Sequence, residues 1–382
     1  MYIKNLNIEN FRGIKKGEIQ FQKGMNILIG PSNIGKSTIL KAIEFALNPY
    51  IPWWQNSTLN ELDFFNGNIK KPINIEIVLG CNKKSCCGED VCSRFEIDTI
   101  EGPKTCRLSS YTLSYEKKTG KILKEEDIKA EQEVELIIKI KMVANFLESD
   151  GYVETKFLIL NEDGEEWHEL NRSMKEWIGC VILDAGRAPE IECAMQNRSF
   201  LSKAIGNINE WKYKYLKDFK EGLKSNIQEL VEGKAKPVFK LIKEKTNEIS
   251  PYFTGEISAT IEGTNKNDLL KQIELSLKAG EGAEIPISRQ GRGLQNIISI
   301  ILGTQLKTFT TTATPPPSIF LLEEPEQNLE PQLQRSLIQT VQGICGQGEQ
   351  ANQIILTTHS PHILSRALPA IATLVDRKSH AR

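Results

Sequence analysis

A short segment near the N-terminus has the residue types and spacing of a phosphate-binding loop. Gly30-Pro31-Ser32-Asn33-Ile34-Gly35-Lys36-Ser37 matches G-x-x-x-x-G-K-[ST], in which glycines let backbone N–H groups converge on a phosphate. The apolar run Met25–Ile29 precedes it, and a helix-like segment that ends before Pro49 follows it, as this pattern requires. We expect Lys36 to neutralise β- and γ-phosphate oxygens and Ser37 to bind Mg²⁺. The other predicted contacts of the loop are Gly30, Asn33, Gly35 and Thr38.

Two glutamates follow an apolar run, and a histidine follows another. Glu323 and Glu324 come directly after Ser318–Leu322, so they would lie at the carboxyl end of a buried strand, where parallel sheets bind ligands. We expect Glu323 to hold Mg²⁺ and Glu324 to orient and deprotonate an attacking water. The run Gln353–Leu356 leads into His359, which could reach the γ-phosphate or that water. The predicted catalytic residues are therefore Lys36, Glu324 and His359.

A second glycine-rich turn opens onto an apolar helix, Ile297–Leu302. A helix N-terminus with a serine and two glycines is a second place where an anion can bind, here through Ser288, Gly291 and Gly293. One site does not need two such loops unless the nucleotide is held from both sides. The pattern therefore favours two copies of the chain, each offering its second loop to the nucleotide of the other.

The elements that position these residues divide the chain into three parts. Short strand-like runs from 72 to 170 predict an antiparallel layer against a nucleotide-binding sheet, and apolar residues at helical spacing from 198 to 249 predict a helical arm. Residues 211–245 carry ten lysines against five acidic residues, which fits either solvated helix faces or a nucleic-acid contact. The predicted parts are 1–190 and 281–382, two halves of one head, and 191–280, a helical insertion.

Composition limits the class of protein. The 382 residues carry a net charge of −1, so no global field favours nucleic acid or membrane. The N-terminus lacks a signal peptide, and no apolar run reaches the roughly 18 residues of a membrane span, which predicts a cytoplasmic protein with no membrane partner. Cysteines in such a protein are ordinarily reduced thiols. Four of the eight nevertheless crowd together and could instead form a structural zinc site: Cys81, Cys86, Cys87 and Cys92.

With these motifs in place, the sequence resembles the ABC-type ATPases of the RecF/Rad50/SMC group. It is most similar to the ATPase part of the overcoming-lysogenization-defect (OLD) family. The resemblance is carried by Ile8–Gly13, Gly30–Ser37, Gly291–Gln295, Leu321–Glu326 and Thr357–Pro361. It implies an α/β, P-loop ABC-type ATPase head with an antiparallel β layer and a helical insertion, which binds ATP and Mg²⁺ as an ATP-sandwiched homodimer.

The resemblance also assigns further roles. Arg12 would lie near the nucleotide, Ser288–Gly293 would be the signature loop and Asn328–Pro331 the D-loop. Two departures, a Glu-Glu pair where many ABC proteins have Asp-Glu and a loose signature loop, predict slow or conditional hydrolysis. OLD-family nucleases usually continue into a Toprim nuclease domain, and we expect none within this chain, where roughly twenty residues follow His359.

Three functions follow from this resemblance. In the first, the chain is an ATPase that senses a signal or regulates a separate effector, a nuclease, in anti-phage defence, with DNA as a further partner; the chain would then be either a stand-alone ATPase or the ATPase half of a longer protein. The alternatives are a RecF-like DNA-repair clamp and a weakly hydrolysing scaffold that assembles a partner according to its bound nucleotide.

Overall fold

The structure is a computed structural model of the 382-residue chain. It describes residues 1–49, 59–81, 96–99, 102–105, 111–119, 121–123, 134–149, 151–184, 193, 199–201, 233, 236–249, 255–261, 273–279, 283–309, 319–346, 352–367 and 371–374.

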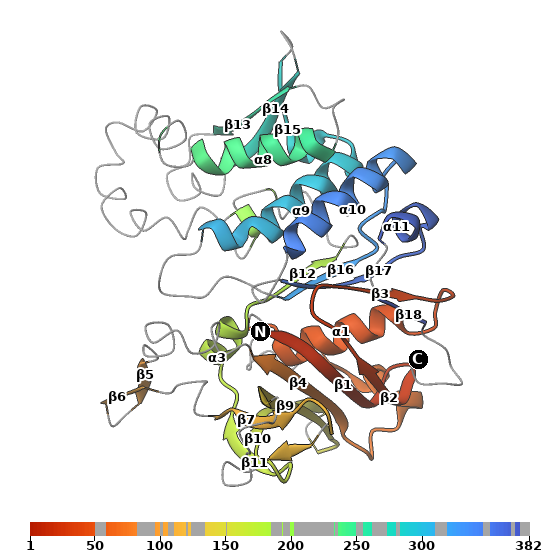
Figure 1. Ribbon diagram of the computed structural model, residues 1–382, viewed down its shortest axis with the longest axis vertical. Helices are drawn as coiled ribbons and strands as arrows, with labels where there is room; N and C mark the ends of the chain where they lie inside the picture. Colours follow the sequence, from red (N-terminus) through yellow and green to blue (C-terminus); the bar gives the residue numbers. More distant parts are fainter. Residues whose placement is uncertain are drawn as a thin grey trace.

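An antiparallel sheet forms the lower layer of the molecule in Figure 1. Its strand order is β11-β10-β9-β4-β1-β2, with the short β7–β8 hairpin paired to β9. Along β1 the apolar residues Ile3, Leu6 and Ile8 are buried, whereas the alternate polar positions are partly exposed, as expected for a sheet with one solvated face. The strands are β1 (Tyr2–Phe11), β2 (Ile14–Gln20), β4 (Ile73–Cys81), β7 (Leu113–Glu116), β8 (Ile122–Leu123), β9 (Val134–Leu147), β10 (Tyr152–Leu160) and β11 (Glu166–Glu169).

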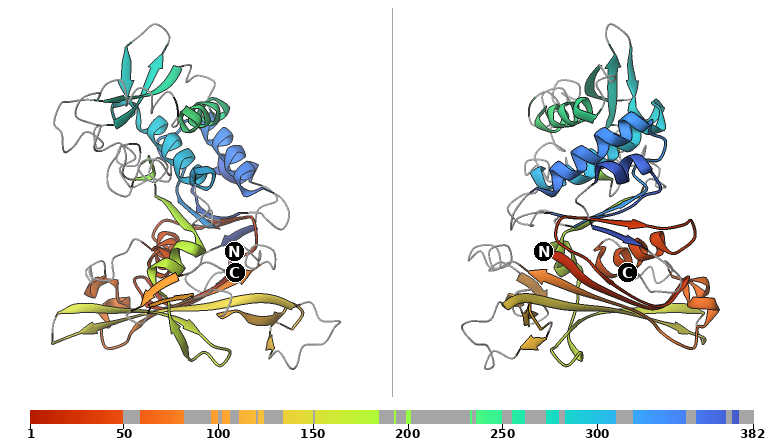
Figure 2. Two further views of the ribbon diagram at one scale, coloured as in Figure 1. Left: turned by 90° about the vertical axis from the view of Figure 1, so that its left-hand side faces the viewer. Right: turned by 45° about the vertical axis from the view of Figure 1, so that its right-hand side comes forward.

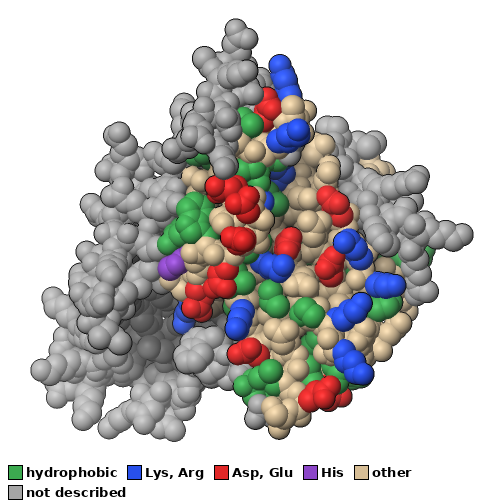
Figure 3. Space-filling model, turned by 90° about the horizontal axis from the view of Figure 1, so that it is seen from below, with side chains coloured by type: hydrophobic (Ala, Val, Ile, Leu, Met, Phe, Trp, Pro, Cys, Tyr) green, Lys and Arg blue, Asp and Glu red, His purple; other side chains and the backbone are tan. Residues whose placement is uncertain are grey.

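The outer face of this sheet is seen from below in Figure 3. Basic and acidic side chains are interspersed over it, and cross-strand ion pairs join Lys16 to Glu9 and Lys141 to Glu76, each at 2.8 Å. Such solvated pairs contribute at most about 1 kcal/mol each. This face therefore carries no field of a single sign.

A parallel sheet lies above, in the order β12-β16-β17-β3-β18. Its central strands β16 and β17 are buried along almost their whole length, as expected for a parallel sheet covered on both faces. The register pairs Glu323 of β16 with Thr357 of β17, and Thr357 with Leu28 of β3. The carboxyl ends of these three strands consequently meet at one edge. The strands are β3 (Met25–Ile29), β12 (Cys180–Asp184), β16 (Ile319–Glu323), β17 (Gln353–Thr357) and β18 (Ile371–Leu374).

Helix α1 (Lys36–Leu47) packs between the two sheets and contacts strands of both (Figure 2). It buries apolar residues against a core shared with the antiparallel sheet, while α8, α9 and α10 enclose a second core on the opposite face of the parallel sheet. No described helix is long and apolar enough to cross a membrane. The other helices are α3 (Arg172–Ile178), α8 (Lys236–Ile249), α9 (Arg292–Phe309), α10 (Pro331–Cys345) and α11 (Pro361–Arg366), with 3₁₀ turns η1 (Glu61–Asp63), η2 (Phe65–Gly67) and η7 (Ile287–Arg289).

Gln353 joins the two sheets through a buried side-chain amide. Its Oε1 accepts a hydrogen bond from the Ile3 backbone N–H at 2.7 Å, and its Nε2 donates to the carbonyls of Ile3 at 2.8 Å and Gln22 at 2.9 Å. Gln353 is fully buried at the start of β17. The start of β1 is therefore tied to the strand that leads to His359.

One local prediction is incomplete and another falls outside the described residues. A three-stranded sheet of β13 (Gly255–Ile261), β14 (Ile273–Ala279) and β15 (Glu284–Pro286) lies beyond α8, where only a helical arm was predicted. A separate two-stranded ribbon consists of β5 (Glu96–Thr99) and β6 (Gly102–Thr105). Most of the lysine-rich segment 211–245 lies outside the described residues, so its nucleic-acid contact stays a prediction. The division of the chain into the parts 1–190, 191–280 and 281–382 also stays a prediction.

The structure gives no support for a zinc site. Cys86, Cys87 and Cys92 lie outside the described residues, and of Cys81 only the backbone, at the end of β4, is described. Among the residues that the structure does describe, no group of three or more metal-ligating side chains gathers. The three cysteines described with their side chains, Cys180, Cys193 and Cys345, are buried thiols.

Candidate functional site

The phosphate-binding loop joins β3 to α1, as predicted. Gly35 is the N-cap residue of α1 and has a φ of +113°, a conformation that side chains other than glycine rarely adopt. No side chain caps this end of the helix. Its first N–H groups can therefore bind an anion, and the positive end of the helix dipole favours one there.

Lys36 is buried beneath this loop. Its Nζ donates hydrogen bonds to the carbonyl oxygens of Gly30 at 2.8 Å and Pro31 at 2.9 Å, so the ammonium group closes the loop on itself. Burial lowers the pKa of Lys36, and the carboxylate of Glu324 partly opposes that shift. Because the cation is poorly hydrated, its attraction for an anionic group such as a phosphate is stronger than it would be in water.

Glu324 begins the segment that follows β16. Its backbone has a φ of +42°, a strained conformation for this residue type. Its N–H donates to the carbonyl oxygen of Thr357 at 3.1 Å and to its Oγ1 at 3.2 Å, which fixes the strained turn against the end of β17. Strain of this kind persists where the surroundings over-determine it, and it clusters at functional sites.

The Glu324 carboxylate contacts two side chains. Gln327 Nε2 donates to Oε2 at 2.7 Å, and His359 Nε2 lies 3.5 Å from Oε1. His359 therefore sits beside the acidic pair, as the sequence predicted. His362 lies instead on α11, where its Nδ1 is 3.3 Å from Nη2 of Arg335 on α10. Helix α11 begins at Pro361, with Ser360 as its N-cap residue and Ser360 Oγ accepting from two backbone N–H groups.

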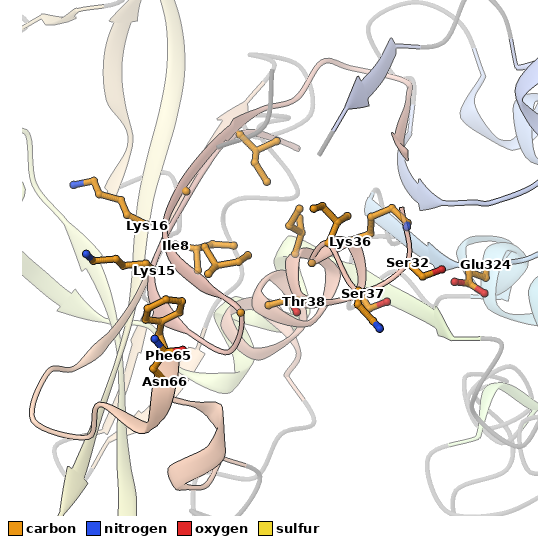
Figure 4. Close-up of a pocket in the computed structure, with 18 of the residues that line it drawn as sticks. Ile8, Lys15, Lys16, Ser32, Lys36, Ser37, Thr38, Phe65, Asn66 and Glu324 are labelled. Atoms are coloured by element: carbon orange, nitrogen blue, oxygen red, sulfur yellow. The ribbon is translucent and has the colours of Figure 1, made fainter. Parts of the chain in front are cut away.

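These side chains line one cavity of about 890 Å³. Lys36, Ser37 and Thr38 come from the start of α1, and Glu324 and His359 from the ends of the two neighbouring strands. Figure 4 shows Ser32 and Glu324 at one end of the cavity and, at the other, residues of the β1–β2 hairpin and η2. Sequence reasoning missed four residues of that second end, because it depends on packing between segments distant in sequence: Lys15, Lys16, Phe65 and Asn66.

Glu323 is the last residue of β16 and pairs in register with Thr357 on one side and Asp184 on the other. It is partly exposed at the same sheet edge, but it is not among the residues that line the cavity. Ser37, its expected partner in Mg²⁺ binding, does line the cavity and is exposed there. The two candidate ligands come from the strand and loop that meet at this edge, and their metal-binding role stays a prediction.

Arg12 lies in the turn between β1 and β2, with a φ of +48°. Its Nε is paired with Oδ1 of Asp63 at 2.7 Å, and its N–H donates to the Asp63 carbonyl, also at 2.7 Å. Arg12 does not line the cavity, whereas the next residue, Gly13, does. The structure thus gives Arg12 the role of anchoring η1 beside the site, and its predicted contact with nucleotide stays a prediction.

The second glycine turn is built around Gln295. This buried side chain donates from Nε2 to the carbonyl oxygens of Ile287 at 3.0 Å and of Ser288 and Gln290 at 2.9 Å each. Ser288 and Gly291 are both exposed, and α9 starts at Arg292, so the turn presents a helix N-terminus to solvent. Neither Ser288 nor Gly291 nor Gly293 lines the cavity around Lys36.

This turn nevertheless contacts the segment that carries Glu324. Asn296 Nδ2 donates to the carbonyl oxygen of Gln327 at 3.0 Å, and a Cβ at Gly293 would lie only 2.6 Å from the carbonyl oxygen of Asn328. Gln327 is the residue whose side chain bonds to the Glu324 carboxylate. The chain thus contains a continuous contact path from Glu324 to the start of α9.

The fold and this arrangement define the class. The crystal structure of "the SmcHead bound to the C-winged helix domain of ScpA" matches with a TM-score of 0.57 and 15% identity, covering 100% of this chain and 96% of that chain. An Smc head domain bound to the C-terminal domain of ScpA, derived from Pyrococcus furiosus, matches with a TM-score of 0.54, also at 15% identity, covering 100% of this chain and 95% of that chain. The protein therefore has the fold of these SMC head domains, and the predicted fold class, an ABC-type head with an antiparallel β layer, is confirmed.

The chain belongs to the AAA ATPase domain family, whose model matches residues 1–364. Among curated relatives, "Endonuclease GajA" of Bacillus cereus is 23% identical over 430 aligned residues, covering 96% of this chain and 58% of that protein.

Two further relatives match over shorter stretches. "DNA double-strand break repair Rad50 ATPase" of Methanopyrus kandleri is 47% identical over 47 residues, 12% of this chain and 5% of that protein. "DNA replication and repair protein RecF" of Clostridium acetobutylicum is 33% identical over 93 residues, 22% of this chain and 26% of that protein. The predicted resemblance to the RecF/Rad50/SMC group is confirmed, and the chain spans less than two thirds of each of these relatives.

Proposed function

We propose that this chain hydrolyses ATP with the help of Mg²⁺ and that its nucleotide state controls an effector nuclease in defence against phage. The observation that carries the hydrolytic part is the convergence of Lys36, Glu324 and His359, from three separate segments, on one cavity. Phosphoryl transfer to water uses a cation that binds the phosphates, here buried at the start of a helix, and a carboxylate and an imidazole that can act on the water.

In this proposal the start of α1 and Lys36 hold the phosphates of ATP. The Lys36 ammonium group exchanges its hydrogen bonds to the loop carbonyls of Gly30 and Pro31 for bonds to β- and γ-phosphate oxygens. Its burial means that little further desolvation is needed when the phosphates arrive. The uncapped N–H groups that follow Gly35 bind the same phosphates.

The donor set at the sheet edge fits Mg²⁺, which prefers oxygen ligands. The Ser37 hydroxyl and the Glu323 carboxylate would hold the ion, the carboxylate directly or through water. When bound, the ion would neutralise part of the charge on the phosphates.

Glu324 is placed to act on the attacking water. A carboxylate at this position can accept the proton of a water aligned with the γ-phosphate, and the contact with Gln327 holds one of its oxygens in a fixed direction. His359, 3.5 Å from the other oxygen, can donate a hydrogen bond to the γ-phosphate or to the water. The positioning of the carboxylate by its neighbours supports a role in orientation as well as in proton transfer.

The exposed second turn supports a two-chain site. Ser288, Gly291 and Gly293 belong to an anion-binding helix start that does not face the cavity of its own chain. In an ATP-sandwiched homodimer the turn of one copy would close over the nucleotide held by the other.

The link to a nuclease and to defence is supported by the similarity to Endonuclease GajA, which extends over 96% of this chain. A role as a DNA-repair clamp is the second candidate, and the similarity to the RecF protein over 93 residues favours it. Co-expression with the products of neighbouring genes, followed by phage challenge, separates the two. A repair clamp gives ATP-dependent binding to gapped or broken DNA and no phage protection.

Glu324→Gln tests the catalytic proposal. We expect the turnover number for ATP to fall at least about 100-fold, because a positioned general base contributes roughly 10²- to 10⁴-fold. ATP binding should persist and the dimer should become longer-lived, as measured by size-exclusion chromatography with multi-angle light scattering with and without ATP. Glu166→Ala, at an exposed position of β11, is the matched control.

Two results would contradict this reading. If Glu324→Gln hydrolyses ATP at the wild-type rate, Glu324 is not the base. If the variant neither retains ATP nor dimerises, the sandwich mechanism is wrong. A wild-type protein that dimerises on ATP without measurable turnover would instead be a nucleotide-dependent scaffold.

A further inference from the structure

The carboxylate of Glu326 bonds to the segment that carries His359. Its Oε1 accepts a hydrogen bond from the Thr358 hydroxyl at 2.6 Å and a second from the backbone N–H of His359 at 2.8 Å. Hydrogen bonds to an ionised acceptor are about twice as strong as those between neutral groups. Neither Glu326 nor Thr358 lines the cavity, so both act from behind it.

His359 depends on its backbone for its position. Its side chain is 40% exposed, and among the described residues the polar partner of the ring is Glu324, at 3.5 Å. A contact of that length is too weak to hold an imidazole in place. The direction of the ring is therefore set by the conformation of the segment between β17 and α11, where the N–H of His359 is held by Glu326.

The same carboxylate organises the rest of this segment. Thr358 is 2% exposed, and its Oγ1, which donates to Glu326, also accepts from the N–H of Ser360 at 3.0 Å. Ser360 in turn caps α11 and donates from Oγ to Gln334 on α10 at 2.5 Å. Glu326 thus anchors one end of a hydrogen-bonded series that fixes the residues on both sides of His359.

The other oxygen of Glu326 is kept at a cost. Oε2 is buried and has no hydrogen-bond partner among the described residues. A buried acceptor without a partner is unfavourable, and native proteins contain few of them. The free-energy cost of burying Oε2 without a partner is offset by the two hydrogen bonds that Oε1 accepts from Thr358 and His359.

We propose that Glu326 is a positioning residue for His359: it holds the backbone of the strand end so that the imidazole stays beside the Glu324 carboxylate. This inference rests on the proposed role of His359 in ATP hydrolysis. Glu326 does not touch the reacting groups, and its effect passes through the hydrogen bonds to Thr358 and to the His359 N–H.

The kinetic test compares Glu326→Ala, Glu326→Gln, His359→Ala and the double variant Glu326→Ala/His359→Ala. We expect Glu326→Ala to lower kcat about 10- to 100-fold with little change in KM, since displacing a catalytic group by about 1 Å costs up to roughly 100-fold. Glu326→Gln retains an oxygen acceptor and should stay within about threefold of wild type. The double variant should be no slower than His359→Ala, because residues that act as a unit are not additive.

A second measurement does not depend on hydrolysis. Amide hydrogen exchange of the peptide that contains His359 should be faster in Glu326→Ala than in wild type, and close to wild type in Glu326→Gln and in the control Glu166→Ala. An unchanged exchange rate in Glu326→Ala overturns the inference. So does a loss of kcat that is equally large with and without His359, because Glu326 would then act through another group.

The two proposals fail in different ways. If the wild-type protein does not hydrolyse ATP, or if His359→Ala is as active as wild type, the proposed role of His359 fails, and the exchange measurement alone decides whether Glu326 holds the segment. If His359→Ala is inactive while Glu326→Ala is fully active, the catalytic site stands and the inference about Glu326 is wrong.

Discussion

Gly293 lies where α9 comes closest to the segment that follows the acidic pair. A Cβ at this position would be 2.6 Å from the carbonyl oxygen of Asn328 and 3.2 Å from Cδ2 of Leu329. Cβ contacts under 3.0 Å essentially do not occur, so in Gly293→Ala the two backbones must separate by roughly 0.4 Å or more. Asn328 has a φ of +61°, and Asn296 bonds to the adjacent Gln327 carbonyl, so this segment cannot yield by a simple side-chain rotation.

The size of the effect follows from two opposing terms. Forcing an extra methyl group into a packed contact costs about 1–3 kcal/mol. Alanine is favoured over glycine within a helix by up to about 1 kcal/mol, which offsets part of that cost. At Gly291, two residues earlier, a Cβ would point into open space with no described atom within 4 Å, so Gly291→Ala is the matched control. We expect Gly293→Ala to be about 1–2 kcal/mol less stable than Gly291→Ala.

Urea denaturation of both variants and of wild type measures this difference. We also expect Gly293→Ala to lower ATP turnover more than its stability change explains, because the displaced segment includes Gln327, whose side chain bonds to Glu324. If the two variants unfold at the same urea concentration, the close approach of α9 to Asn328 does not constrain the fold. If Gly293→Ala is less stable but keeps full turnover, the contact path from α9 to Glu324 has no role in catalysis.

Two further predictions concern stability. Burial lowers the pKa of Lys175 from 10.5 to about 7, although its Nζ lies 3.1 Å from the ring centroid of Phe157. Between about pH 10.5 and 7 the unfolded chain therefore binds a proton at Lys175 that the folded chain lacks. The folded state loses stability as the pH falls through that window. The loss is at most about 5 kcal/mol, because one pKa unit corresponds to 1.36 kcal/mol. Lys175→Met should stabilise the protein more at pH 7 than at pH 9.5 in urea denaturation, and an equal effect at both pH values would refute the shift. Gln353→Leu leaves the buried N–H and carbonyl of Ile3 without their partner, which costs about 1–3 kcal/mol for each unpaired group. Calorimetry should therefore show a lower thermal unfolding midpoint than in wild type and in the control Gln339→Leu, at an exposed position of α10; a midpoint within about 1 °C of wild type would contradict this.

Local patterns were enough to predict the loop, the acidic strand end and the histidine. In each case an apolar strand runs directly into the functional residues, and the type of residue at a fixed spacing limits the chemistry. The helix from Lys36 to Leu47 ends before Pro49 as expected, and the strand Tyr152–Leu160 lies within the run of short strands predicted from 72 to 170. Short-range signals of this kind depend only on neighbouring residues.

The β13–β14 pair was missed although a signal was present. Ile257, Ala259 and Ile261 alternate with polar residues, and Leu275 and Leu277 of β14 are buried at the same two-residue spacing. The strong helical period of the preceding segment dominated the interpretation. The two-residue pattern of β13 extends over only seven residues, so it is weaker than the helical pattern of the longer segment before it.

Other features could not be predicted because their partners are distant in sequence. Gln353 bonds to Ile3 across 350 residues, and Glu326 bonds to the N–H of His359 across 33. A glutamine or a glutamate has no local pattern that names its partner, since its hydrogen bonds are decided by which backbone groups the finished fold leaves unpaired nearby. The same holds for Arg12. The resemblance predicts that it lies near the nucleotide, but this does not indicate that it pairs with Asp63.

The parallel register explains why residues almost 300 positions apart form one site. Leu28, Thr357 and Glu323 lie side by side on β3, β17 and β16, so the chain leaves all three strands at the same level, into Gly30, Thr358 and Glu324. A slip of β16 by one residue would turn its buried side chains to the opposite face of the sheet and move Glu324 away from Thr357. Because β16 is apolar and buried on both faces, its pattern alone does not exclude that slip. The hydrogen bonds from the Glu324 N–H to Thr357 and from the His359 N–H to the Glu326 carboxylate do exclude it, so the groups that fix the register are also those that place the catalytic candidates.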